Sequence, residues 1–175
     1  YFGYWKDRHD PEYHEDLTGP VEGFIKPGLG FEEAKPGEGF IRLGVGILEK
    51  QEEGEYNWQK TYPILDHGSW EVKYGADWIT FVHQLESDFG YAYEYTKTIR
   101  LKEDGFVIHH LLKNTGEKAI ETDQFNHNFF MIDGEKSGPA FQLTFPYALS
   151  ADGDLKGYLE IQDDKLTFVR DIEQG

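Results

Sequence analysis

The sequence predicts an all-β protein, and three observations support this class. Aromatic residues make up 16% of the 175 residues, and 20 residues are glycines, a composition that favours short strands joined by tight turns. Apolar and polar residues alternate through several runs, which is the pattern of half-buried strands. Glycine, proline and acidic residues separate these runs. We therefore expect antiparallel sheets that pack as a β-sandwich.

The length of the chain bounds its domain count. A chain of 175 residues is long enough to bury one substantial core and too short for two domains of ordinary size. No internal repeat, low-complexity tract or interdomain linker divides it. We expect one domain over residues 1–175. The first residue is Tyr1 rather than methionine, which suggests a processed or truncated start.

The charge of the chain argues against two classes of partner. It has 33 acidic and 17 basic residues, a net charge of -16, and this charge repels phosphate backbones and anionic lipid. The sequence has neither a transmembrane run nor a signal segment. We expect a soluble protein without nucleic-acid or membrane partners. The absence of cysteine excludes disulfides but leaves the cellular compartment open; the oligomeric state is open as well.

The first 24 residues lack periodicity and are predicted to form a loop. His9, Glu12 and His14 lie close together there, but their spacing fits no zinc pattern, so we expect no metal. Glu22 stands between turn-forming residues and an aromatic residue, where its carboxylate could line a cleft and accept hydrogen bonds from hydroxyl groups. The alternative is an exposed glutamate in a turn.

Two strands are predicted in the next part of the chain. After a loop at residues 27–39, the run 40–48 predicts one strand with Arg42 on the face opposite its apolar neighbours. Such an arginine needs a partner, which is either a ligand or one of the abundant acids. A charged turn follows, and residues 57–65 predict another strand.

The clearest alternation is found at residues 78–85. It places His83 on an apolar face together with Ile79, Phe81 and Leu85. A histidine on such a face is either a core residue or part of a site. We expect a site if a second histidine lies on a neighbouring strand of the same sheet.

A long hairpin is predicted after the turn at Asp88. Its first strand spans residues 91–101 and begins with three tyrosines at alternate positions. An Asp-Gly turn signal leads into the second strand at residues 106–113. His109 and His110 fall on opposite faces of that strand, so at most one of them reaches a common cleft.

The remaining strands are predicted at residues 119–131, which close a further hairpin, and around turns in the runs 141–149 and 158–169. The first of these carries His127, which shares a strand face with Phe125 and Phe129. Imidazole titrates near neutral pH, so a histidine in an apolar cleft wall can transfer a proton. The alternative is a core histidine with one hydrogen-bonded partner.

The motif around this histidine resembles a known family. Asn126-His127-Asn128-Phe129-Phe130, preceded by Asn114-Thr115-Gly116, is similar to the signature of the galactose mutarotase (aldose 1-epimerase) superfamily. The similarity covers the middle third of the chain and continues upstream at residues 82–85, 90–91, 95–101 and 106–113. It implies the galactose mutarotase-like supersandwich. That fold needs about a hundred residues more after His127, so we expect the chain to lack terminal strands.

The resemblance also implies roles for individual residues. The motif histidine of the superfamily is the general acid in sugar ring opening, which implies this role for His127. The family's base is a glutamate on a late strand, whose counterpart would lie beyond Gly175, so Glu22 is the substitute that we predict. Arg42 looks most like the family's arginine that binds sugar hydroxyls. The predicted substrate-binding residues are Arg42, His83, Tyr91 and Asn128.

These features predict a carbohydrate-active protein that interconverts sugar anomers by acid–base catalysis, as aldose 1-epimerases do. Its partner would be a mono- or oligosaccharide, and it would need no cofactor. One alternative is a non-catalytic carbohydrate-binding or accessory domain of a glycan-processing protein, which the missing family base favours. Another is a fragment with a structural role inside a larger chain.

Overall fold

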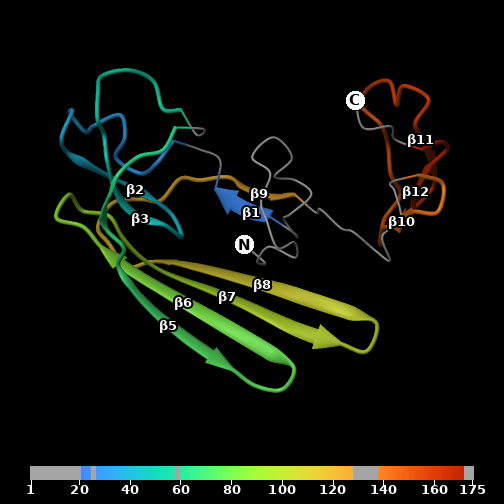
Figure 1. Cartoon of the computed structure of the whole chain (residues 1–175), viewed down its shortest axis with the longest axis horizontal. Helices are drawn as coiled ribbons and strands as arrows, with labels where there is room; N and C mark the ends of the chain where they lie inside the picture. The colour runs from blue at the N-terminus through green and yellow to red at the C-terminus, as the bar shows by residue number, and fades with distance from the viewer. Residues whose placement is uncertain (1–20, 25–26, 58–59, 128–137, 172–175) are drawn as a thin grey trace, which may run out of the picture. The chain divides into compact units, whose positions relative to one another are not determined.

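The computed structural model describes residues 21–24, 27–57, 60–127 and 138–171 (Figure 1). These residues form twelve strands and no helix, which confirms the all-β prediction. None of them belongs to a helix capable of crossing a membrane. The chain divides into two compact units, residues 22–127 and residues 1–21 with 128–175.

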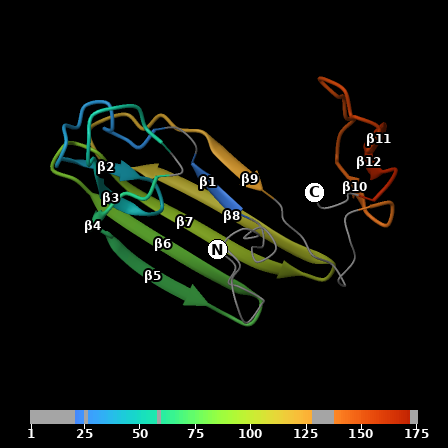
Figure 2. The same cartoon turned by 45° about the horizontal axis from the view of Figure 1, so that its top comes forward.

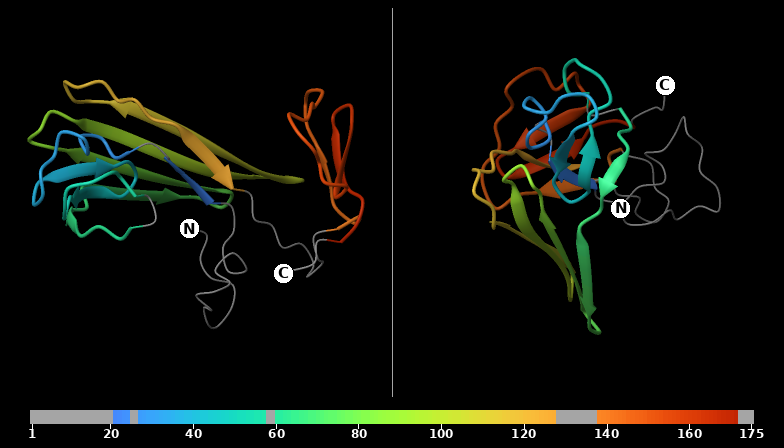
Figure 3. Two further views of the ribbon diagram at one scale, coloured as in Figure 1. Left: turned by 90° about the horizontal axis from the view of Figure 1, so that it is seen from above. Right: turned by 90° about the vertical axis from the view of Figure 1, so that its left-hand side faces the viewer.

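Three sheets lie within residues 21–127. One pairs β1 (Val21–Phe24) with β9 (Gln124–His127), and the two strands run side by side in Figure 3. The second has the order β2 (Gly39–Arg42), β3 (Gly46–Glu49) and β4 (Ile64–Asp66). The third has the order β5 (Ser69–Tyr74), β6 (Trp78–Glu86), β7 (Ala92–Lys102) and β8 (Gly105–Asn114).

The four-stranded sheet has one apolar face, which we call the inner face. Its antiparallel register pairs His83 of β6 with Tyr95 of β7, and Leu85 with Tyr93. Directly paired residues point to the same side of a sheet, so all four side chains share the inner face. The predicted alternation around His83 and the predicted long hairpin of β7 and β8 are confirmed.

The main core lies between the inner face and β2. Ile41 of β2 packs with Leu85 and Tyr93 of the four-stranded sheet, and all three side chains are buried. Burial of such side chains contributes about 1.5–3 kcal/mol each to folding. Figure 1 shows β2 and β3 gathered at one end of the long sheet, whose other end extends beyond them. The core therefore covers only part of the inner face.

A second, aromatic core lies on the other side of the hairpin formed by β2 and β3. Phe40 is fully buried, and its ring meets the rings of Phe31 and Tyr62 edge-on at centroid distances of 5.0 and 5.1 Å. Leu48 and Tyr56 pack against the same group. The hairpin is thus buried on both faces.

The prediction of one strand at residues 40–48 is wrong. The chain turns after Arg42, where the Val45 N–H donates to the Arg42 carbonyl at 3.0 Å. Gly44 has φ +74° and Gly46 has φ +148°, and glycine adopts these conformations without the steric cost that a side chain brings. The two glycines convert the predicted strand into the hairpin β2–β3.

Two further predictions need correction. Of the described residues in the region 57–65, only Ile64 and Leu65 belong to a strand, β4. Tyr62 enters the aromatic core, where its hydroxyl accepts the Asn57 N–H at 3.2 Å. The described part of the region 119–131, residues 119–127, does not form a hairpin with β8. Instead, β9 starts at Gln124 and pairs with β1.

The second unit contains one three-stranded sheet with the order β10 (Gln142–Thr144), β12 (Lys165–Phe168) and β11 (Leu159–Gln162). Its strands fall in the two predicted runs. Asp163 and Asp164 form the turn between β11 and β12, and Asp163 adopts φ +54°. The Arg170 guanidinium lies 3.7 Å from the centroid of the Tyr158 ring.

The hairpin geometry predicts that Gly46→Ala destabilises the protein. A Cβ atom at this position would overlap the Asp66 carbonyl oxygen, and the positive φ adds backbone strain. We expect a loss of about 2 kcal/mol in the free energy of unfolding, measured by urea denaturation. Gly105→Ala is the matched control, because nothing lies within 4 Å of its added Cβ. Equal effects of the two substitutions would contradict this account.

Candidate functional site

Four titratable side chains meet on the inner face, and we call them the polar cluster: Glu22 of β1, Tyr95 and Lys97 of β7, and His110 of β8. Strand alternation places Tyr95 and Lys97 on the same face, and the register pairs Lys97 with His110. Figure 2 shows β1 beside β7 and β8. Glu22 therefore reaches the cluster from a different sheet.

The carboxylate of Glu22 is the centre of the polar cluster. Its Oε2 atom lies 2.6 Å from Lys97 Nζ and 3.2 Å from His110 Nε2. The Glu22 side chain is 7% exposed, against 21% for Lys97 and 19% for His110. Oε2 is buried, and among the described residues it makes these ion-pair contacts without an aligned hydrogen bond. The ammonium group offsets the cost of burying the carboxylate.

Tyr95 links the imidazole to β1. Its hydroxyl lies 2.7 Å from His110 Nδ1, and the two rings are nearly parallel, with centroids 6.0 Å apart. Burial, helped by the nearby Glu22 carboxylate, raises the pKa of Tyr95 to about 12, so the hydroxyl keeps its proton at neutral pH. Phe24 meets the Tyr95 ring edge-on at 5.5 Å. β1 is thus held on β7 by both Glu22 and Phe24.

His83 is fully buried and belongs to a separate group of side chains on the inner face. Its Nε2 lies 2.8 Å from the His67 carbonyl oxygen and its Nδ1 lies 3.0 Å from the Tyr93 hydroxyl. A carbonyl only accepts, so Nε2 carries the proton and Nδ1 accepts from Tyr93. Trp70 stacks on the imidazole at 4.1 Å and stays 50% exposed. Burial lowers the pKa of His83, which keeps its imidazole neutral at neutral pH.

Arg42 lies at the end of β2. It lines a small hollow with Phe24, Leu29 and Thr122. The hollow has room for about one water molecule. Burial raises the pKa of Tyr56, and the positive charge of Arg42 partly offsets this rise. Through Phe24, the hollow borders the aromatic contact to the polar cluster.

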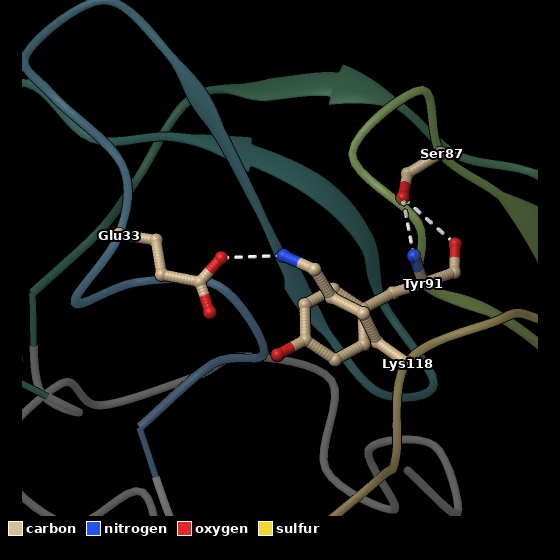
Figure 4. A network of polar contacts seen from close by, with 4 residues as sticks. All are labelled: Glu33, Ser87, Tyr91 and Lys118. Atoms are coloured by element: carbon tan, nitrogen blue, oxygen red, sulfur yellow. Dashed lines mark hydrogen bonds and ion pairs between the residues drawn. The ribbon is translucent and has the colours of Figure 1, made fainter.

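Tyr91 lies directly before β7 in a third group of contacts (Figure 4). The Lys118 ammonium lies 4.9 Å from the centroid of the Tyr91 ring and also pairs with Glu33. The Ser87 hydroxyl donates to the Tyr91 carbonyl at 2.7 Å and accepts the Tyr91 N–H at 3.2 Å. One face of the predicted substrate-binding ring is therefore covered by a lysine.

His127 is the last residue of β9, so its backbone lies in the same two-stranded sheet as Glu22. The His127 side chain and the whole of Asn128 lie outside the described residues, as do the three N-terminal residues weighed as metal ligands. In the part of the chain that is described, no group of three or more histidine and acidic side chains could hold a metal ion.

The predicted site residues therefore fall into separate groups of contacts. Glu22 contacts Lys97 and His110, whereas His83 and Tyr91 each have partners of their own. Lys97 was not predicted as a site residue, although alternation along β7 could have placed it on the inner face together with Tyr95. The contact with Glu22 could not be foreseen, because it depends on how β1 packs.

The buried His83 predicts a pH dependence of stability. Its pKa in the folded state lies below the ordinary value of 6.5, so the unfolded chain binds a proton more readily. Stability from this group is complete above pH 6.5 and is lost as the pH falls towards the lowered pKa. We expect the free energy of unfolding to fall between pH 7.5 and 5.5, and to fall less in His83→Gln. Equal slopes in urea denaturation would refute this origin.

Comparison of the chain with protein-family models, curated proteins and solved structures found no match. The resemblance to the galactose mutarotase superfamily therefore stays a prediction.

Proposed function

We propose that this protein is carbohydrate-active and interconverts sugar anomers by acid–base catalysis, as aldose 1-epimerases do. The pairing of β1 with β9 carries the proposal, because it puts Glu22 and His127 on adjacent strands although they are far apart in the sequence. These are the two residues that we expect to act as base and acid.

The reaction needs two proton transfers in each direction. Glu22 accepts the proton of the anomeric hydroxyl while His127 donates a proton to the ring oxygen. The bond between the anomeric carbon and the ring oxygen breaks, and a carbonyl group forms at the anomeric carbon. After rotation about the neighbouring C–C bond, the ring closes on the other face, and both protons return. A carboxylate and an imidazole supply this pair of roles near neutral pH.

The surroundings of Glu22 suit a sugar. Phe24 and Tyr95 form an aromatic pair beside the carboxylate, and the indole of Trp70 is half exposed on the same inner face. The apolar face of a pyranose packs on aromatic rings, while its hydroxyls bind polar side chains. The polar cluster next to the rings of Phe24 and Tyr95 provides such groups.

A second candidate function is sugar binding without turnover, and the state of Glu22 favours it. The carboxylate is 7% exposed and already contacts Lys97 at 2.6 Å. A covered carboxylate acts as a base only if the sugar hydroxyl reaches its second oxygen. If this never happens, the same groups bind a sugar and leave its anomers unchanged.

An anomer-equilibration assay on several aldoses tests the proposal. We expect the wild type to equilibrate anomers faster than buffer, and Glu22→Gln and His127→Gln to lower the rate by about 100-fold or more, because each removes one proton-transfer group. Glu71→Gln is the matched control, since Glu71 is 59% exposed and pairs with the equally exposed Lys73. Its rate should equal that of the wild type.

Sugar titration and thermal unfolding of the same samples separate the two candidate functions. A wild-type rate equal to the buffer blank, together with saturable sugar binding, would refute catalysis and support binding without turnover. If the protein shows neither a rate above the blank nor sugar binding, both candidate functions are refuted. A large drop in melting temperature for His127→Gln with unchanged sugar binding would show that this histidine is a packing residue.

A further inference from the structure

Resting on the proposed function, we propose that Lys97, His110 and Tyr95 are positioning residues for the base. They hold one oxygen of the Glu22 carboxylate, Oε2, and so leave the other oxygen, Oε1, to receive the proton of the sugar.

The two carboxylate oxygens of Glu22 have different surroundings. Both ion-pair contacts, to Lys97 Nζ and to His110 Nε2, are made by Oε2, which is buried. Oε1 takes part in neither contact. Two cationic or proton-bearing groups on one oxygen fix the plane of the carboxylate, so Oε1 keeps a constant direction. A base held in this way meets its proton with little reorganisation.

The direction of the hydrogen bond between Tyr95 and His110 follows from the proton on Tyr95. Its hydroxyl keeps its proton at neutral pH, and it lies 2.7 Å from His110 Nδ1. When the imidazole is neutral, Tyr95 therefore donates to Nδ1 and the ring proton resides on Nε2. This tautomer presents N–H rather than a lone pair to the Glu22 carboxylate, 3.2 Å away. The opposite tautomer would place two acceptors against each other.

The contacts close on themselves through β1. Phe24 packs edge-on against Tyr95, Tyr95 binds His110, His110 contacts Glu22, and Glu22 lies two residues before Phe24. Strand alternation sends Glu22 and Phe24 to the same side of β1. Each contact in this ring therefore restricts the next, and a change at Tyr95 reaches Glu22 without touching it.

The charges of Glu22 and Lys97 suit a base that holds its proton only briefly. Before the reaction Glu22 is negative beside the positive Lys97. When Oε1 accepts the anomeric proton, the carboxylic acid is neutral and its charge attraction to the Lys97 ammonium is lost. The proton returns to the anomeric oxygen when the ring closes. Lys97 exchanges no proton in this scheme.

The test is Tyr95→Phe, which removes the hydroxyl and keeps an aromatic ring against Phe24. We would record the imidazole ¹⁵N chemical shifts at pH 8 and assign His110 by its loss in His110→Asn. The wild type should show the proton on Nε2, and Tyr95→Phe should show a mixture of tautomers. In the anomer assay, the same variant should lower kcat by up to about 100-fold with little change in KM.

Two matched variants serve as controls. Tyr74→Phe removes a hydroxyl from a side chain that is 78% exposed, and His109→Asn removes the neighbouring imidazole from the other face of β8. Both should leave the tautomer and kcat unchanged. A proton on Nδ1 in the wild type, or a tautomer unaffected by Tyr95→Phe, would overturn the inference. A wild type without activity but with the expected tautomer shift would instead overturn the proposed function.

Discussion

The candidate site depends on one row of side chains, Tyr93, Tyr95 and Lys97, on the inner face of β7. β7 is paired along its length with β6 on one side and β8 on the other, so alternation fixes where each of the three points. Tyr93 enters the core and hydrogen-bonds His83. Tyr95 packs against the edge of that core and binds His110 of the polar cluster, and Lys97 pairs with Glu22 in the same cluster. A single strand therefore joins the part of the inner face that is packed to the part that holds charge.

The two histidines of the inner face, His83 and His110, have different surroundings. His83 is fully buried, and both ring nitrogens have fixed partners in the core, so a proton added to Nδ1 would remove the hydrogen bond that Tyr93 donates to it. His110 is 19% exposed, and its Nε2 lies 3.2 Å from the Glu22 carboxylate. The first histidine therefore belongs to the core, and the second contacts the candidate base.

Local sequence patterns predicted the long, regular strands. They failed where contacts between distant segments determine which strands form and pair. Alternation identified β6, β7 and β8 and the apolar surroundings of His83, because these strands pair with their neighbours in the sequence. It failed at residues 40–48, although Gly44 and Gly46 carry the signal for a turn. The pairing of β1 with β9, and hence the meeting of Glu22 with Lys97, joins segments from opposite ends of the unit. No local pattern encodes such a pairing.

A double-mutant cycle between Glu22 and Lys97 measures the interaction that joins β1 to β7. The free energies of unfolding of the wild type, Glu22→Gln, Lys97→Met and the double variant would be compared at pH 7. The cycle cancels the other contacts of each side chain. A direct, largely buried ion pair predicts a coupling energy of about 1 kcal/mol or more. If the two effects add to within about 0.3 kcal/mol, Glu22 does not contact Lys97 on β7. The polar cluster would then not exist.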